Sequence, residues 1–145
     1  MKPATRVQPP ILGHLTEVCI VTSNYKETID GFAELGVGPF QIFHLNRETC
    51  RDLKFRGEDG TFDIIACFAT QGEMAVEIMQ PVDGPSLMQE YLDRNDGRAG
   101  LQHVAWSMGD GQKSKERIET MARRDVAVAM QGTWLGKSGT CQVWL

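Results

Sequence analysis

The chain repeats one pattern in its two halves: a histidine, an apolar strand-like run and then an amphipathic helix. The first copy runs from His14 to Thr22 and continues into a helix that ends near Gly36. The second copy opens with residues 101–108, which include His103, and continues into a helix over 114–124. Because one such unit cannot bury its apolar face alone, the repeat predicts two units packed together.

Three strand candidates complete the first unit. They cover residues 40–45, 62–70 and 75–79, and the connection between the last two is short enough for a hairpin. Ser23 or Asn24 can cap the helix, and Asn24 is followed three positions later by Glu27, which is the spacing of an N-cap and its reciprocal partner. The first unit is therefore predicted to be a strand, a helix and three more strands.

The rest of the chain divides into a loop, a connector and a shorter second unit. Residues 46–61 are charged and glycine-bearing, which predicts a loop over a site with a short strand at 52–55. The connector has helical spacing over 86–92. The second unit offers strands over 126–130 and 140–145, and it ends one strand short of the first.

The length and composition predict one α+β domain. A chain of 145 residues with 41% hydrophobic and 23% charged residues is long enough to bury a core. Residues 1–12 contain three prolines and no periodicity, so we expect an extended arm there. The single domain then covers 13–145, with module one at 13–82, the connector at 83–99 and module two at 100–145.

Charge and hydropathy argue against two classes of partner. A net charge of -4 gives no general attraction to nucleic acid or to anionic lipid. No apolar run reaches secretory length or the roughly 18 residues that a membrane span needs. We therefore expect a cytoplasmic protein with no nucleic-acid or membrane partner.

The four cysteines are widely separated and form no disulfide frame or zinc knuckle. Two of them, Cys19 and Cys67, lie inside strand-like runs, where a thiol behaves as a small hydrophobe. Reduced, buried thiols are the expectation. A reactive thiol at Cys50 or Cys141 is the alternative.

Two histidines and one glutamate are candidates for a metal site. His14 and His103 enter equivalent runs of the repeat, so a pseudo-two-fold axis would let their imidazoles face each other. Each histidine alone is better explained as an ordinary strand residue, and only the matched pair favours a metal site. Glu77 interrupts an apolar run, where a carboxylate needs a nearby cation, unless it points outward to solvent. Such a set suits zinc, nickel, cobalt, manganese or iron.

Four segments carry a resemblance to a known family. The chain resembles the vicinal oxygen chelate (glyoxalase, bleomycin resistance and dioxygenase) superfamily over residues 13–145, through GHLTEVCIV, VEIMQP, GPSLMQEYL and GLQHVAWSM. The resemblance implies paired βαβββ modules that form a curved mixed sheet around a central metal-binding cleft, with the second module incomplete. It also implies a fourth ligand on a strand that would fall beyond Leu145, so that either the chain is a fragment or water or a neighbouring subunit completes the site.

The resemblance is closest in appearance to methylmalonyl-CoA epimerase and glyoxalase, because extradiol dioxygenases use no carboxylate at the place of Glu77 and bleomycin-binding relatives lack the metal set. It implies a metal-dependent epimerase, isomerase or lyase that removes a proton next to the carbonyl of an acyl thioester or 2-oxo compound. An extradiol-type dioxygenase and a non-catalytic drug-binding protein are the alternatives.

The catalytic base and the oligomeric state are less determined by the sequence. Glu48 and Glu58, both in the loop over 46–61, are the candidates for the base. His44 is either a further base candidate or a surface residue.

A homodimer is expected because modules of this superfamily pair within or between chains, and because a missing strand would expose a sheet edge.

Overall fold

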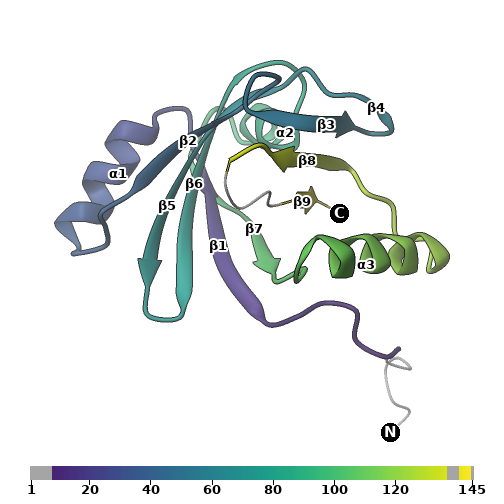
Figure 1. The fold of residues 1–145 in the computed structure, drawn as a ribbon. Coiled ribbons are helices and arrows are strands. Elements are labelled where there is room, and N and C mark those ends of the chain that lie inside the picture. The colour runs from purple at the N-terminus through teal and green to yellow at the C-terminus, as the bar shows by residue number, and fades with distance from the viewer. Residues whose placement is uncertain (1–7, 137–140, 145) are drawn as a thin grey trace, which may run out of the picture.

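The structure is a computed structural model that describes residues 8–136 and 141–144. Figure 1 shows how its elements are arranged. In chain order they are β1 (Leu15–Val21), α1 (Tyr25–Glu34), β2 (Gln41–Leu45), β3 (Cys50–Phe55), β4 (Glu58–Asp59), β5 (Asp63–Gln71), β6 (Met74–Asp83), α2 (Leu87–Arg94), β7 (Gly100–Trp106), α3 (Gly111–Arg123), β8 (Met130–Trp134) and β9 (Cys141–Trp144).

A five-stranded mixed sheet forms the centre of the molecule, in the order β2-β5-β6-β1-β7. Strand β1 pairs in parallel with β6 on one side and antiparallel with β7 on the other. Helix α1 lies on one side of this sheet, while α3 and the second sheet, β4-β3-β8-β9, lie on the other (Figure 1). The buried core fills the space between the two sheets, where Met79, Leu53 and Met130 belong to one apolar cluster.

Helix α1 begins where the sequence predicts. The Asn24 side chain accepts a hydrogen bond from the backbone N–H of Glu27 at 3.3 Å, and its Nδ2 donates to Glu27 Oε2 at 3.1 Å. The first bond satisfies a backbone N–H that a helix start leaves without a partner, and the second joins the two side chains. The capping prediction is confirmed.

The predicted hairpin joins β5 and β6, but β6 is longer than expected. Gln71 pairs with Met74, so the turn between them has two residues, and β6 then continues past Pro81 to Asp83. Pro81 is tolerated because β1 pairs with β6 only as far as Met79. Beyond that point no strand in the described part of the chain pairs with this side of β6, so a residue without an N–H loses no ladder bond there.

The strand predicted over residues 126–130 is wrong, because the chain there is still leaving α3. The N–H of Val126 donates to the carbonyl of Met121 at 3.0 Å, which closes the helix end, and strand β8 begins only at Met130. Strand β8 pairs with β3, the short strand expected within 46–61, which runs over Cys50–Phe55. Of the strand expected over 140–145, Thr140 and Leu145 lie outside the described residues.

The α+β class and the first βαβββ module are confirmed, the module being β1, α1, β2, β5 and β6. The second unit matches it only through β7 and α3, because β8 and β9 join β3 in the separate sheet. The reason is that β3 offers β8 an edge where Leu53 and Met130 become buried together. In the described part of the chain, no helix has the length and apolar character needed to cross a bilayer.

Two glycines at positive φ provide a test of this packing. Gly84, after β6, has φ +75°, and a Cβ atom there would lie 2.6 Å from the Thr61 carbonyl oxygen. Gly72, in the β5–β6 turn, has φ +62° with open space around it. Alanine at either position pays about 1–2 kcal/mol for the left-handed backbone. We expect Gly84→Ala to lose roughly 1–3 kcal/mol more than Gly72→Ala in urea unfolding, from overpacking. Equal losses would contradict the close approach.

Candidate metal centre

The register of three adjacent strands brings Cys19, Glu77 and His103 together. Cys19 on β1 lies opposite Glu77 on β6 and opposite His103 on β7. Side chains of directly paired residues project from the same face of a sheet. One ligand atom of each residue, the thiol sulfur, a carboxylate oxygen and a ring nitrogen, lies within 4.8 Å of the other two. We call this side of the five-stranded sheet the site face.

Glu77 is the most constrained residue of the site. It is 1% exposed, and among the described residues neither of its carboxylate oxygens has a hydrogen-bond partner. A buried carboxylate without such partners is costly unless a cation lies beside it. The nearest basic atom is His103 Nε2, which lies 3.4 Å from Glu77 Oε2. Glu77 therefore points inward, which excludes the solvent-facing alternative that the sequence left open.

His103 is oriented toward Glu77 by its neighbour in sequence. Its Nδ1 contacts the side-chain oxygen Oε1 of Gln102, and its side chain is 17% exposed. An amide oxygen only accepts hydrogen bonds, so Nδ1 carries the proton and the Nε2 of a neutral ring presents a lone pair to Glu77. A proton or a metal ion between His103 Nε2 and Glu77 Oε2 would give both atoms a partner. Metal-binding histidines commonly donate their other ring N–H to an oxygen in this way.

Glu17 lies next along β1 on the site face. It is two residues before Cys19, so the two side chains project from the same side of the strand. Its partners on the adjacent strands are Ala75 and Ala105, whose small side chains leave room for it. Burial, and then the negative charge of Glu77, raise the pKa of Glu17 to about 7, and the charge of His103 partly offsets this rise. The site face thus carries a surplus of negative charge.

The described cysteines are free and buried. Burial and the carboxylate of Glu77 raise the pKa of the Cys19 thiol, which keeps it protonated in the metal-free protein. Burial likewise raises the pKa of Cys50, which opposes the reactivity that the sequence left open there. The Cys141 side chain lies outside the described part of the chain.

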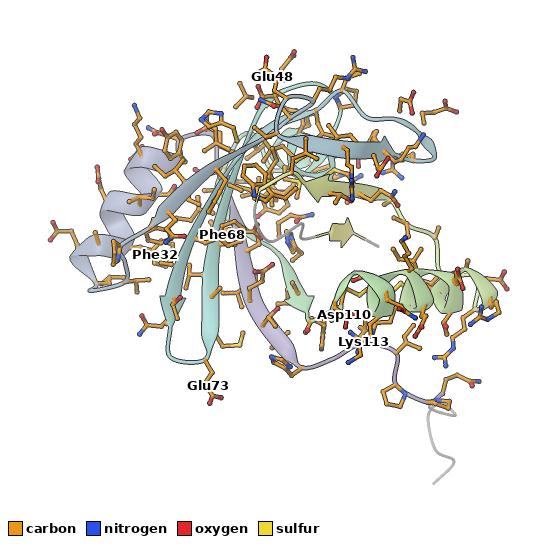
Figure 2. The ribbon with its side chains drawn as sticks, in the orientation of Figure 1. Phe32, Glu48, Phe68, Glu73, Asp110 and Lys113 are labelled. Atoms are coloured by element: carbon orange, nitrogen blue, oxygen red, sulfur yellow. The ribbon has the colours of Figure 1, made fainter. Side chains whose placement is uncertain are left out.

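Aromatic residues adjoin the polar group. Phe68 on β5 pairs with Glu77 across the hairpin, and Figure 2 shows it near the middle of the molecule. Phe43 packs edge-on against Phe68 at a centroid distance of 5.8 Å and against Trp134 of β8 at 5.6 Å. The site therefore has a charged part on β1, β6 and β7 beside an apolar part on β5, β2 and β8.

The structure does not bring His14 into this group. His14 is exposed just before β1, and its carbonyl accepts a hydrogen bond from the N–H of Ser107 at 2.9 Å. It precedes Cys19 by five residues, which in a strand corresponds to roughly 16 Å. A metal-binding role for His14 stays a prediction.

The candidates for a base are all exposed. Glu48 lies in the turn after β2, at the outer end of the molecule in Figure 2, and Glu58 lies in β4 opposite Phe55. His44 neighbours Phe43 in β2, so its side chain projects from the face opposite the site face. The roles of Glu48 and Glu58 stay predictions.

Glu17 and Cys19, three and five residues after His14, were not predicted as site residues from the sequence. The histidines match the two units in one way, whereas the strand register matches them in another. A sequence signal for Glu17 did exist. It precedes the N-cap of α1, Asn24, by seven residues, the same spacing that separates His103 from the N-cap of α3, Asp110.

Comparisons with known proteins identify a family and several solved structures that this chain is similar to. A family model described as the glyoxalase/bleomycin resistance protein/dioxygenase superfamily matches residues 16–143. A crystal structure of a selenomethionine methylmalonyl-CoA epimerase is similar at 20% identity and a TM-score of 0.51, over 92% of this chain and 94% of that one. No curated protein matches the chain at a significant level.

Two further solved structures are similar. A triple mutant of 4-hydroxymandelate synthase from Streptomyces coelicolor has 17% identity and a TM-score of 0.53, over 86% of this chain and 35% of that one. A hypothetical protein from Bacillus halodurans C-125 has 16% identity and a TM-score of 0.52, over 88% and 89%. At these identities the similarity shows the fold alone.

The raised pKa of Glu17 predicts a pH dependence of stability. Its carboxyl titrates near pH 7 in the folded state, against 4.5 for the ordinary value. The folded state therefore binds this proton more tightly, so the free energy of unfolding falls as the pH rises from about 4.5 to about 7. After discounting for solvent screening, we expect a fall of about 1–2 kcal/mol.

Urea unfolding of EDTA-treated protein at pH 5 and pH 8 measures this fall. Glu17→Gln should remove it. Glu73→Gln is the matched control, because Glu73 lies in the exposed β5–β6 turn (Figure 2) and should leave the fall intact. A Glu17→Gln variant that keeps the full wild-type fall would contradict the assignment.

Proposed function

Since the chain belongs to the glyoxalase/bleomycin resistance protein/dioxygenase superfamily, we propose that it is a metal-dependent epimerase, isomerase or lyase that moves a proton next to a carbonyl group. The observation that carries this proposal is the carboxylate of Glu77, buried without hydrogen-bond partners and facing His103 Nε2. A bound divalent cation would offset that buried charge. The reaction would be similar to that of a methylmalonyl-CoA epimerase or a glyoxalase.

Glu77 and His103 are the two residues that we propose as central metal ligands. Glu77 is held by β6 in the middle of the sheet, and His103 is held by β7 at its edge, where Gln102 further orients the ring. A divalent metal ion held there, whether zinc, nickel, cobalt, manganese or iron, would supply positive charge to polarise a carbonyl oxygen. The protein's own part is to hold its ligands without rearrangement, because both strands are fixed by their ladders.

The substrate that we propose is a small acyl thioester or 2-oxo compound. Its carbonyl would lie at Glu77 and His103, and its apolar part would contact the aromatic group of Phe43, Phe68 and Trp134. Phe68 is the cross-strand neighbour of Glu77, so the two parts of the substrate would be adjacent. An apolar wall beside a few polar groups is the usual composition of a small-molecule site.

A carboxylate from the segment after β2 is our proposal for the base. Glu48 precedes β3 and Glu58 forms part of β4, and β3 pairs with β8, which carries Trp134. Glu58 thus belongs to the sheet that lies against the site face, and Glu48 lies in the turn that leads into that sheet. Their exposure leaves each of them free to approach a bound substrate.

Exchange with solvent deuterium tests the proposed reaction. Metal-loaded protein incubated in D₂O should place deuterium on the carbon next to the carbonyl of an acyl-CoA or hemithioacetal substrate, as followed by mass spectrometry. We expect Glu77→Gln and His103→Ala to lower this rate at least about 100-fold, because each removes a ligand. Glu48→Gln and Glu58→Gln are compared in the same assay, and loss in one of them identifies the base.

Glu73→Gln is the matched control, since it removes a carboxylate from the exposed β5–β6 turn. It should exchange at the wild-type rate. No exchange by metal-loaded wild-type protein across the substrate panel would contradict the proposal, and oxygen uptake with catechols would favour a dioxygenase. Ligand binding that survives Glu77→Gln and His103→Ala without any catalysis would favour a drug-binding protein.

We also propose that two copies of the chain associate through β7. This strand is the last of its sheet among the described residues, and Leu101 on it is 60% exposed. An exposed edge strand presents N–H and carbonyl groups that can pair with a second chain, and a two-fold axis would pair β7 with its own copy.

Light scattering tests this association. We expect a mass near twice 16.1 kDa, and a return to one chain in Leu101→Lys. Ile42→Lys places the same charge on β2, the other edge of the sheet, and should leave the dimer intact. A single-chain mass for the wild type at micromolar concentration would contradict the association.

A further inference from the structure

We infer that Glu17, not His14, is the metal ligand that β1 contributes, so that Glu17, Glu77 and His103 form a carboxylate-rich site for an oxygen-preferring divalent cation such as Mn²⁺. The inference rests on the proposed function only in taking the site to bind a metal. It assigns a third ligand and a class of metal, neither of which the family or the matched histidines determine.

The internal repeat, matched through the structure, pairs Glu17 with His103. Both residues precede the N-cap of the following helix by seven positions. The antiparallel ladder agrees, because Cys19 pairs with His103 and Glu17 pairs with Ala105. A two-fold rotation between β1 and β7 that moves Glu17 onto His103 moves Cys19 onto Ala105, and so it preserves both pairs. The same shift places His14 on Gly100, a position without a side chain.

Glu17 lies one residue pair away from the other two proposed ligands on the site face. It projects from the site face between Ala75 and Ala105, so no large side chain separates it from Glu77 or His103. Its charge interacts with both of those residues. Two carboxylates on one face with a single imidazole leave an excess of negative charge, and the oxygens of the more deeply buried one, Glu77, have no hydrogen-bond partner among the described residues.

Cys19 is the competing third ligand, and its position argues against that role. Its sulfur lies close to Glu77 and His103, but the residue is fully buried and belongs to the apolar core with Val21 and Met79. Its counterpart in the second unit is Ala105, which has no ligand atom. Its burial in the core and its match to Ala105 both indicate that Cys19 packs beneath the site and does not bind the metal.

The ligand set determines which metal the site favours. Carboxylate oxygens suit manganese and magnesium, whereas imidazole and thiolate ligands suit zinc. Non-haem iron oxygenases use two imidazoles and one carboxylate, the reverse of the ratio here. A site built from Glu17, Glu77 and His103 should therefore bind Mn²⁺ with less preference for Zn²⁺ than a site with two histidines.

Calorimetric titration of the full-length, EDTA-treated protein with Mn²⁺ and with Zn²⁺ tests the assignment, with Mn²⁺ binding also followed by electron paramagnetic resonance. Glu17→Gln should weaken Mn²⁺ binding at least about tenfold. Glu17→His should shift the ratio of the two dissociation constants about tenfold toward zinc. His14→Ala and Cys19→Ser should bind Mn²⁺ like the wild type. Circular dichroism confirms that each variant is folded.

Three results would overturn the inference: unchanged Mn²⁺ binding in Glu17→Gln, loss of binding in His14→Ala or Cys19→Ser, or no binding by the wild type. Because Glu17→His retains a ligand, its changed metal preference separates coordination from a structural effect of removing the carboxylate. The deuterium-exchange assay is read separately. Mn²⁺ binding that depends on Glu17 without any exchange would end the proposed function and leave this assignment standing.

Discussion

The carboxylate of Glu77 is buried in the middle of the sheet without hydrogen-bond partners among the described residues, and the rest of the site is arranged around that charge. Its backbone is held on both sides, by Phe68 of β5 and by Cys19 of β1. The side chain therefore has little freedom to reach solvent. A buried charge of this kind lowers stability unless a cation compensates it, so the fold accepts a cost at the place where its chemistry would occur.

The strand order explains how residues distant in sequence meet at that charge. Strand β1 lies between β6 and β7, so one strand from the first module carries neighbours from the end of that module and from the start of the second. Cys19 consequently faces both Glu77 and His103. The second sheet then brings Trp134 against Phe43, which places an apolar group next to the charged one. Association of the two units thus produces the site, and neither unit holds it alone.

Much of the fold was predictable from local signals, whereas the site was predictable only in part. The Asn24 cap and the β5–β6 hairpin depend on residues close in sequence, and both were confirmed. Glu77 was predicted because a carboxylate in an apolar strand is unusual, and His103 because it occupies the same place in the repeat as His14. The third ligand depends on how β1 is aligned with β7 in the sheet. That alignment does not follow from the sequence positions of His14 and His103. The prediction of a strand over 126–130 was wrong for a similar reason. Val126 has strand propensity, but its N–H closes the end of α3.

Anomalous X-ray diffraction from crystals of the full-length protein grown with Mn²⁺ would test the account most directly. Data collected at the manganese absorption edge locate the ion without reference to activity or to any variant. The account predicts one dominant anomalous peak bounded by carboxylate oxygens of Glu17 and Glu77 and by Nε2 of His103. A dominant peak at His14, or an empty site face with Glu77 still buried, would contradict it.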